Sequence, residues 1–515
     1  MPMAFKNEPI TDFSKPANVR KQKEALSRIR PKLGKTYPLI IGGKKIRTTD
    51  TIVSLNPANT AETVARFAKA DTHLAERALE AALKAFERWK HVPAKERASF
   101  LFTAARIMRR RRFEINAWMI KEVGKNYTEA DADTAEAIDF LEFYGREMLR
   151  LSGPQPLTPV AGERNQLTYI PLGVGLVIPP WNFPFAIMAG MTTASLVAGN
   201  TVLLKPSSDS PMMAYLLMEI LEEAGLPAGV VNFIPGPGSS VGDYLVGHPK
   251  IRFIAFTGSM EVGLHINELA AKRAAGQIWI KRVIAEMGGK DAIIVDDDCD
   301  LEAAVKGTIV SAFGYQGQKC SACSRVIVHA AVYRRFLDRL LEEAGKLVVG
   351  SPEENAPMGP VINERSKQTI MSYIDIAVRE GGNIVHGGGP ADGPGWFVQP
   401  TIITDVKPRD TIAQEEIFGP VLAVIKAKNF DEALAIANDT IYGLTGSVYS
   451  KNREHLERAR RDFHVGNLYF NRKCTGALVG GHPFGGFNMS GTDSKAGGRD
   501  YLLLFTQAKL VSEKL

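Results

Sequence analysis

The sequence predicts an α/β protein with more than one domain. Its 515 residues exceed the length at which one hydrophobic core stops growing, so two or three domains are expected. A helix-rich stretch over about 72–152 precedes, from Gly173 onwards, short apolar strands that alternate with helices. That alternation is typical of a parallel sheet covered by helices. With 45% hydrophobic and 23% charged residues, the composition is that of an ordinary globular protein.

The composition excludes several classes of protein. No apolar run reaches the roughly 18 residues of a membrane helix, and the first residues lack the basic-then-apolar order of a secretory signal. We therefore expect no membrane association and a cytoplasmic location. Four cysteines are too few for a disulfide scaffold, and no second C-x-x-C motif completes a zinc site. Reduced thiols and no metal are expected.

The net charge of +7 does not predict a nucleic-acid partner. Lys and Arg are spread among Asp and Glu along the chain. The densest basic run, Arg109–Arg112, lies in a helix-like stretch, and we interpret it as a solvated helix face. No helix-turn-helix candidate is present. A basic balance also suits an anionic substrate or cofactor, so a small-molecule ligand is expected.

The first part of the chain is predicted to be scaffold. Residues 37–44 indicate a hairpin, with an apolar strand, a glycine turn and a polar strand. Apolar residues recur every three to four positions over 72–152, with almost no proline or glycine, which predicts helices. Gly153-Pro154-Gln155-Pro156 ends them, and residues 166–170 alternate as a strand does.

Four strands and three helices are predicted next. The strands are expected at 174–178, 201–205, 230–234 and 251–256, and the helices at 185–198, 211–224 and 239–247. In an open parallel sheet the ligand lies beyond the carboxyl ends of the strands, so the residues after each strand are candidates for a binding site. Those segments are 179–184, 205–208, 235–238 and 257–259, all rich in turn residues and hydrogen-bond donors.

Two of these segments have the chemistry of a phosphate site. Gly236, Gly238 and Gly242 form a G-x-G-x-x-x-G pattern, one residue longer than the usual dinucleotide fingerprint. Ser259 opens a predicted helix at Met260, where backbone N–H groups and a hydroxyl can bind a phosphate. A plain helix N-cap is the alternative interpretation of Ser259.

A second α/β segment follows. It begins with Glu286–Lys290. Strands are expected at 291–295, 325–328, 421–425 and 446–449, and a helix at about 300–313. Residues 466–491 are rich in glycine. Residues 501–515 alternate between apolar and polar, which predicts a terminal strand that would be able to add to a partner's sheet.

Cys320 lies in a polar loop, Gly317–Cys323, between the predicted helix 300–313 and the strand 325–328. A thiolate is a strong nucleophile, but only a few per cent of an ordinary thiol is ionised near pH 7, so its surroundings must activate it. Lys319 would contribute to this activation. From this stretch alone, the alternatives are a small buried hydrophobe, half of a metal site, or a redox pair with Cys323.

Seven motifs, in order, resemble those of the aldehyde dehydrogenase superfamily over nearly the whole chain. They are Pro180–Pro184, Lys205–Ser207, Phe256–Ser259, Glu286–Lys290, Gly317–Cys320, Glu415–Pro420 and Pro483–Gly486. The resemblance implies a Rossmann-like NAD(P)-binding domain (1–150 and 171–287), an α/β catalytic domain (288–490) and a small β oligomerisation arm (151–170 and 491–515). It also implies a homodimer or a higher homo-oligomer.

Within the superfamily, the chain is similar to the enzymes that oxidise L-glutamate 5-semialdehyde, formed by ring opening of 1-pyrroline-5-carboxylate, to L-glutamate. Three stretches carry this resemblance: Gly317–Ala322, Phe463–Arg472 and Thr475–Gly480. The last resembles a loop that anchors the substrate carboxylate. The alternatives are another carboxylated semialdehyde, such as that of succinate or methylmalonate, and a non-enzymatic binding or structural protein on the same fold.

The resemblance implies three catalytic residues. Cys320 would attack the aldehyde to give a thiohemiacetal and, after loss of hydride, a thioester. The Asn182 amide and the backbone N–H of Cys320 would bind the oxyanion, and Glu286 would activate the water that hydrolyses the thioester. Taken alone, Asn182 could equally be a turn residue, and Glu286 a surface or capping residue.

The resemblance also implies a nicotinamide cofactor, mainly NAD. Its implied residues are Ile178, Pro179, Trp181, Lys205, Ser208, Gly238, Gly242, Gly258, Ser259, Glu416 and Phe418. Ser208 stands where many NAD-preferring relatives have a glutamate that repels a 2′-phosphate, so we predict measurable use of NADP. The implied substrate residues are Phe183, Lys319, Ser321, Gly476, Ala477 and Phe484. Cys299, Cys323 and Cys474 are expected to be structural.

Overall fold

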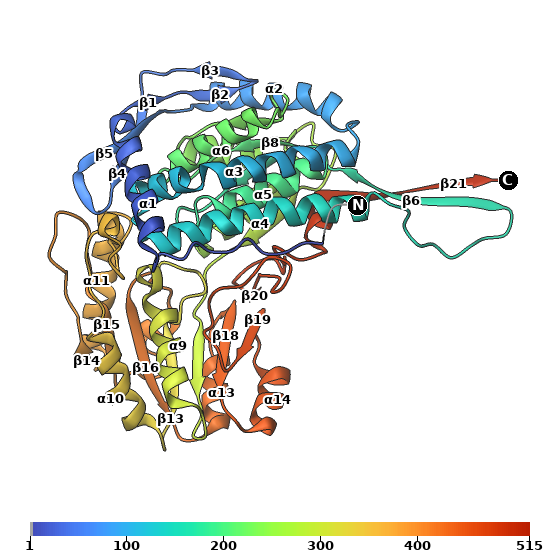
Figure 1. Cartoon of the computed structure of the whole chain (residues 1–515). Helices are drawn as coiled ribbons and strands as arrows, with labels where there is room; N and C mark the ends of the chain where they lie inside the picture. Colours follow the sequence, from blue (N-terminus) through green and yellow to red (C-terminus); the bar gives the residue numbers. More distant parts are fainter. Residues whose placement is uncertain (1–3) are drawn as a thin grey trace.

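The computed structural model describes residues 4–515 and has two lobes and a projecting arm (Figure 1). One lobe, drawn in blue and green, combines a seven-stranded sheet with long helices. The other, drawn mainly in yellow and orange, is built on a second seven-stranded sheet. The arm extends away from both lobes. The expectation of an α/β protein with more than one core is confirmed.

The first sheet has the strand order β11-β10-β7-β8-β9-β2-β3. Its strands are β2 (Leu39–Ile41), β3 (Lys44–Ile46), β7 (Val174–Ile178), β8 (Thr201–Leu204), β9 (Val231–Phe233), β10 (Phe253–Thr257) and β11 (Arg282–Glu286). Strands β7 to β11 are parallel, whereas β2 joins β9 antiparallel. The four expected strands and the hairpin are confirmed, and β11 is an addition. Helices cover the parallel strands, which explains why the sequences of these strands are apolar throughout and do not alternate between apolar and polar residues.

Four helices connect the parallel strands of this sheet. They are α5 (Ala186–Val197), α6 (Pro211–Glu223), α7 (Asp243–Gly247) and α8 (Met260–Ala271). The helices expected at 185–198 and 211–224 are confirmed, as is a helix start at Met260. The stretch 239–247 differs, because residues Gly238–Gly242 form a π-type turn and the α-helix starts only at Asp243. Glycines at both ends of the turn disfavour a regular helix there.

Long helices form the scaffold of this lobe. They are α1 (Pro16–Ile29), α2 (Thr72–Trp89), α3 (Ala94–Val123) and α4 (Tyr127–Leu151). Asp71 caps α2 by accepting the Leu74 N–H at 2.8 Å, and Asn126 caps α4 by accepting the Glu129 N–H at 3.0 Å. The helices predicted over 72–152 are confirmed. A three-stranded sheet of β1 (Thr36–Tyr37), β5 (Asn59–Ala68) and β4 (Thr51–Asn56) precedes them and was not expected.

The second sheet has the order β14-β15-β16-β13-β12-β18-β19. Its strands are β12 (Ala292–Val295), β13 (Arg325–His329), β14 (Asn383–His386), β15 (Thr401–Thr404), β16 (Val421–Ala427), β18 (Thr445–Tyr449) and β19 (Asn467–Phe470). Helices α9 (Leu301–Phe313), α10 (Tyr333–Ala344), α11 (Glu364–Arg379), α12 (Thr411–Gln414), α13 (Phe430–Asn438) and α14 (Arg453–Asp462) surround it. The strands and the helix predicted for this segment are confirmed. Two short strands, β17 (Tyr442–Gly443) and β20 (Phe487–Asn488), pair with each other beside the sheet.

The arm consists of β6 (Glu163–Pro171) and β21 (Thr506–Lys514), which pair antiparallel within the chain. A strand was expected over 166–170 and is longer in the structure. The terminal strand was expected over 501–515, but Tyr501–Phe505 forms a 3₁₀ helix. Leu502 and Phe505 are fully buried in the core of the first lobe, so the arm begins at Thr506.

The interpretation of the basic run as a solvated face is wrong for Arg112. Its side chain is largely buried, and Nε and Nη2 donate to the two carboxylate oxygens of Asp131 at 2.6 and 2.5 Å. Arg109, also on α3, pairs with Glu8 near the start of the chain and with Glu142 on α4. The run therefore fastens α3 to α4 and to the leader, the described segment that precedes α1 (residues 4–15). In residues 4–515 no helix is long and apolar enough to cross a membrane.

Candidate active site

The carboxyl edge of the first sheet meets the amino edge of the second. β7 leads into the segment that holds Asn182, β11 ends at Glu286, and Cys320 lies before β13. The Asn182 Nδ2 atom donates a hydrogen bond of 3.1 Å to the main-chain oxygen of Gln318. The side chain of Asn182 is only 4% exposed. Residues from both lobes thus converge on the loop that carries the cysteine.

Two further contacts join the lobes here. The ring of Trp181 lies edge-on to Phe418, with 5.5 Å between the ring centroids. Glu416 accepts the N–H of Gly289 at 3.2 Å. A Cβ on Gly288 would lie 2.1 Å from Glu416 Oε2, so a larger residue there would displace this carboxylate. The motif after β11 and the motif before β16 are therefore in direct contact, as an active site between two domains requires.

A left-handed turn shapes the Cys320 loop. Tyr315, Gln316 and Gly317 all have positive φ angles, of 51°, 55° and 66°. Such angles are uncommon for residues with a Cβ and concentrate at functional sites. Gly317 has no alternative, since a Cβ there would lie 2.2 Å from the carbonyl oxygen of Gly419. The turn ends α9 and fixes the chain just before Cys320.

The Cys320 thiol is protonated at neutral pH in this arrangement. Burial raises its pKa well above the ordinary value, and three neighbouring carboxyl groups raise it further. The Lys319 Nζ does not offset them, because it lies 3.7 Å from Glu129 Oε1. The expectation that Lys319 activates the thiol is therefore not supported.

Glu286 has the environment of a general base. Burial raises its pKa to about 8, although the hydroxyl of Ser494, which donates to Oε1, and the nearby ammonium of Lys495 lower it. Its Oε2 has no hydrogen-bond partner within residues 4–515. A carboxyl group that titrates near neutrality and keeps one oxygen free is suited to taking a proton from water.

The residues expected to bind a cofactor gather beyond β7, β8, β9 and β10. Ile178 ends β7 and Pro179 follows it. Lys205 is 6% exposed, burial lowers its pKa to about 8, and its Nζ makes no hydrogen bond in the described chain. A Cβ on Gly242 would lie 3.4 Å from Lys205 Cε, so the ammonium stem borders the glycine turn. A buried, unpartnered ammonium beside a glycine turn fits the hydroxyls and phosphates of a dinucleotide.

The phosphate-binding candidates are open to solvent. Ser259 is exposed and caps α8, its Oγ accepting the Val262 N–H at 3.4 Å. No atom lies within 4 Å of the Cβ position of Gly238, whereas at Gly258 a Cβ would meet the ring of Phe256 at 2.5 Å. Ser208 is exposed as well. These donors fit an anionic cofactor, and the N-cap is compatible with that use.

The residues expected to bind the substrate lie around the same loop. The Lys125 Nζ lies 4.0 Å from the ring centroid of Phe183. The main-chain oxygen of Ser321 accepts from the Cys474 thiol at 3.4 Å, which places the start of the segment Thr475–Gly480 beside the catalytic loop. In that segment Gly476 has a φ of 77° and is exposed, Ala477 is half-buried, and Phe484 farther on is half-buried too.

Sequence reasoning missed a line of carboxyl groups on α4. Glu129, Asp133 and Glu136 follow the i, i+4, i+7 spacing of one helix face. Asp133 pairs with the buried Lys125 at 2.6 Å, and burial raises the pKa of Glu136 to about 8. This spacing within a predicted helix was the available signal. Buried Lys290, whose Nζ has no partner in residues 4–515, was also missed.

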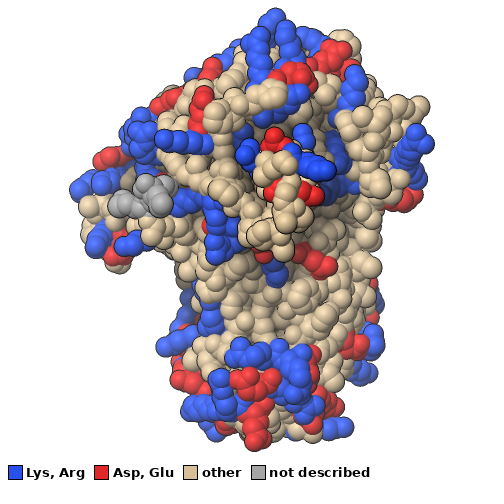
Figure 2. All heavy atoms as spheres, turned by 90° about the vertical axis from the view of Figure 1, so that its right-hand side faces the viewer, with Lys and Arg blue, Asp and Glu red and all other residues tan. Residues whose placement is uncertain are grey.

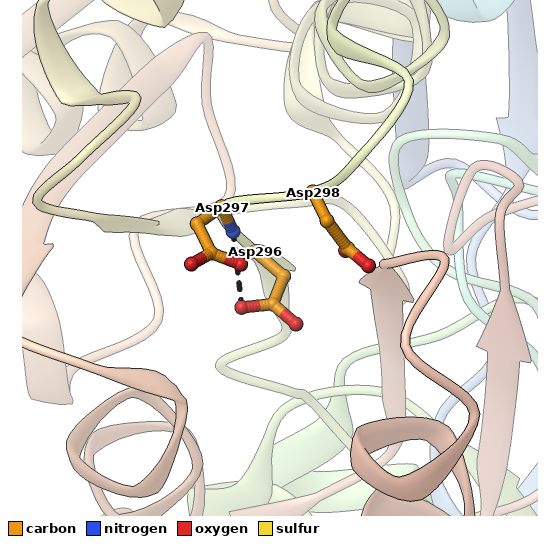
Figure 3. A group of neighbouring side chains, drawn as sticks. All are labelled: Asp296, Asp297 and Asp298. Carbon is orange, nitrogen blue, oxygen red and sulfur yellow. Dashed lines mark hydrogen bonds between the residues drawn. The ribbon is translucent and has the colours of Figure 1, made fainter.

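Three consecutive acidic residues, Asp296, Asp297 and Asp298, lie close together in Figure 3. They follow the carboxyl end of β12, whereas Cys320 lies near the amino end of the adjacent, parallel β13. Asp296 Oδ2 accepts from Ser450 at 2.7 Å and contacts His455 Nδ1 at 2.6 Å. The cluster is therefore used within the fold, away from the cysteine.

Comparisons with known proteins agree with this geometry. The model of the aldehyde dehydrogenase family matches residues 45–511. A 1-pyrroline-5-carboxylate dehydrogenase of Bacillus cytotoxicus is 59% identical over 516 residues, covering both chains completely. The structure of a Thermus 1-pyrroline-5-carboxylate dehydrogenase with bound NAD has 53% identity and a TM-score of 0.98, again over all of both chains. Proline utilization A of Bdellovibrio bacteriovorus is 45% identical over this whole chain and 54% of its own, with a TM-score of 0.98. The chain belongs to the aldehyde dehydrogenase family.

Proposed function

We propose that this chain oxidises L-glutamate 5-semialdehyde, the open form of 1-pyrroline-5-carboxylate, to L-glutamate, with NAD as its main cofactor. The observation that carries the proposal is the meeting of Cys320 with Asn182 and Glu286 across two lobes. Full-length relatives at 59% identity that carry the corresponding name support the choice of substrate. The activity belongs to the catabolism of proline.

The proposed reaction begins at Cys320. The thiol gives up its proton to solvent, its sulfur forms a bond to the aldehyde carbon, and the C=O electron pair moves onto the oxygen. The Asn182 amide and the Cys320 backbone N–H donate hydrogen bonds to that oxyanion. One hydrogen of Asn182 Nδ2 is donated to Gln318 O in the structure, and the second hydrogen of the same NH₂ group is the one assigned to the oxyanion.

Bound NAD supplies a hydride acceptor, so that the adduct carbon is oxidised to a thioester. Hydrolysis then needs a water molecule at that carbon. Glu286 takes a proton from the water as it attacks, the C–S bond breaks, and the thiol of Cys320 is regenerated with a carboxylic acid product. The free Oε2 of Glu286 is the atom available for that proton.

The proposed substrate site has to compensate an α-carboxylate and an α-ammonium. The hydroxyl of Ser321 and the backbone N–H groups of Gly476 and Ala477 are assigned to the carboxylate, near the ammonium of Lys319. The carboxyl groups on α4, Glu129 among them, supply negative charge for the ammonium group. Phe183 and Phe484 line the aliphatic part.

The same proposal includes the cofactor residues. Lys205 and Glu416 would hold the two riboses, Ser259 and Gly238 would bind the pyrophosphate, and Phe418 would contact the nicotinamide ribose. Trp181 supports Phe418 through the ring contact of 5.5 Å. The exposed Ser208, in place of a carboxylate, leaves room for a 2′-phosphate, so NADP is used as a second cofactor.

We propose a homo-oligomer that is assembled through the arm. Figure 2 shows, on the face from which the arm projects, a broad uncharged zone between charged regions. Ile278 and Ile280 are 85% and 90% exposed, and nearby Arg282 donates to the main-chain oxygens of Leu503 and Thr506 at the base of the arm. Light scattering of a chain ending at Phe505 tests this idea: loss of the oligomer supports it, and an unchanged mass contradicts it.

A cytoplasmic location completes the proposal, in keeping with four unpaired thiols.

The test of the function is formation of reduced cofactor with 1-pyrroline-5-carboxylate, compared with succinate semialdehyde and acetaldehyde. We expect the first substrate to exceed the others in kcat/KM, and Cys320→Ala to abolish turnover. Ala477→Leu should reduce kcat/KM for glutamate semialdehyde far more than for acetaldehyde. Preference for another semialdehyde would agree with the family assignment but contradict the proposed substrate. Inactivity towards all three would favour a binding protein on this fold.

A further inference from the structure

We propose that Ser494 is a positioning residue for the general base, holding Oε1 of Glu286 so that Oε2 is left free for the hydrolytic water. The inference rests on the proposed function, since it assigns a partner to the base of that reaction. It concerns one step, the hydrolysis of the thioester on Cys320, and leaves the formation of that thioester to other residues.

The carboxylate of Glu286 lies in a cradle made by the glycine-rich residues on both sides of β20, from Gly485 to Ser494. The side-chain hydrogen bond to Glu286 comes from the Ser494 hydroxyl, which donates to Oε1. A Cβ on Gly485 would lie 2.8 Å from Oε1, and one on Gly491 would lie 3.3 Å from Oε2. Main-chain bridging between Glu286 and Gly491 fastens the cradle to the end of β11. Small residues therefore let the segment close around the carboxylate without filling the space at Oε2.

Ser494 itself is held rigidly. It is 2% exposed, and its main chain lies so close to Gly485 that a Cβ there would meet the Ser494 carbonyl oxygen. Thr492, two positions earlier, accepts the N–H of Ala285 at 3.0 Å through its hydroxyl and donates its own N–H to the Ala285 oxygen at 2.9 Å. The segment is thus attached to β11 on the residue just before Glu286. A hydroxyl fixed in this way selects one orientation of the carboxylate.

Other charges around the base are also fixed by the segment. Lys495 donates to the main-chain oxygens of Gly466 at 2.7 Å and Gly485 at 2.6 Å, which holds its ammonium near Glu286. Lys495 lowers the pKa of Glu286, whereas Asp493 raises it. Glu286 in turn raises the pKa of Cys320 and that of Tyr501. These groups stay in place when the Ser494 hydroxyl is removed.

The sign of the effect follows from the hydrogen bond. A hydroxyl that donates to the ionised carboxylate lowers its pKa, so Ser494→Ala should raise the pKa of Glu286 above its value of about 8. At neutral pH less of the base is then ionised, and the ionised form is also less well oriented. We expect hydrolysis of the acyl-enzyme at pH 7 to slow by about tenfold, the size of effect given by loss of one hydrogen bond to a charged group.

The experiment isolates that step. p-Nitrophenyl acetate acylates the Cys320 thiol directly, so the rate at which acetyl-enzyme disappears, measured by mass spectrometry across pH, reports on Glu286 without cofactor. Ser494→Ala should slow deacylation and shift its pH midpoint upward. Ser494→Thr, which keeps the hydroxyl, should restore the wild-type midpoint.

A matched control is Ser490→Ala. Ser490 is another fully buried serine of the same segment, and its hydroxyl accepts the Gly443 N–H at 3.0 Å without contacting Glu286. It should leave the pH midpoint in place, and thermal melting of each variant checks folding. An unshifted midpoint in a folded Ser494→Ala protein, or faster deacylation, overturns the inference. A wild-type enzyme that deacylates normally but makes no reduced cofactor from 1-pyrroline-5-carboxylate would instead overturn the proposed function.

Discussion

The ammonium of Lys319 lies 3.7 Å from the carboxylate of Glu129, so the positive charge next to Cys320 in the sequence is partly compensated by a carboxylate of α4. The thiol is left with burial and with carboxyl groups, all of which disfavour the thiolate. The surroundings of Cys320 in the structure therefore favour its protonated form, which is the weaker nucleophile.

The first prediction concerns alkylation of Cys320. Because its pKa is well above the ordinary value, iodoacetamide should react more slowly at pH 7 than with free cysteine, and the rate should still be rising above about pH 9, where a free thiol levels off. Peptide mass spectrometry with Cys320→Ala as the control assigns the site. A profile that levels off near pH 8 or below would contradict a suppressed thiolate. Lys319→Gln should leave the profile unchanged.

The second prediction concerns Asn182. Asn182→Ala removes one donor to the proposed oxyanion, so kcat with glutamate semialdehyde should fall by about 10²–10³. The same change leaves Gln318 O without its 3.1 Å partner, and thermal melting should record a modest loss of stability. Binding of NAD, followed by protein fluorescence, should persist. A variant that retains more than half of the wild-type kcat would exclude Asn182 from the oxyanion site.

The third prediction concerns cofactor choice. Ser208 is exposed, and the adjacent Asp209 accepts a hydrogen bond of 3.2 Å from Asn363 Nδ2. Ser208→Glu adds a carboxylate at the proposed ribose position, and opposing a 2′-phosphate with a like charge costs several kcal/mol. The ratio of kcat/KM for NAD to that for NADP should rise by roughly tenfold or more. Ser208→Gln is the uncharged control, and an equal effect of both variants would point to size instead of charge.

Most of the fold could be predicted because its strands are buried on both faces. Runs such as 174–178 and 201–205 are apolar throughout and flanked by turns, so their limits agree with β7 and β8 within one residue. The 3₁₀ helix Tyr501–Phe505 could not be told from a strand, because its apolar residues are buried by tertiary packing against α5 and α4. Local pattern carries no information on that packing.

The residues of the candidate site also fall into those that the sequence could identify and those that it could not. Cys320, Glu286 and Asn182 stand in motifs, so sequence could select them. The carboxyl groups of α4 and the hydroxyl of Ser494 act only through contacts across long separations, as in the pairing of Ser494 with Glu286. For Lys319, the sequence shows the neighbouring Cys320 but not the distant partner Glu129, so this ion pair could not be predicted.

The last prediction concerns stability and follows from Arg112. Its guanidinium donates to both oxygens of Asp131, and Asp131 also accepts from Asn116 Nδ2 at 2.9 Å and from the Thr11 N–H at 2.6 Å. Arg112→Met keeps the aliphatic stem but leaves a fully buried carboxylate without its cation, which typically costs about 3–5 kcal/mol. Urea unfolding should show this loss at pH 7. The exposed Arg110, which pairs with the part-exposed Glu223, is the matched control, and Arg110→Met should cost about 0–1 kcal/mol. Equal losses for the two variants would mean that the Arg112 pair is screened like a surface pair, and that the leader is held to α3 and α4 by other contacts.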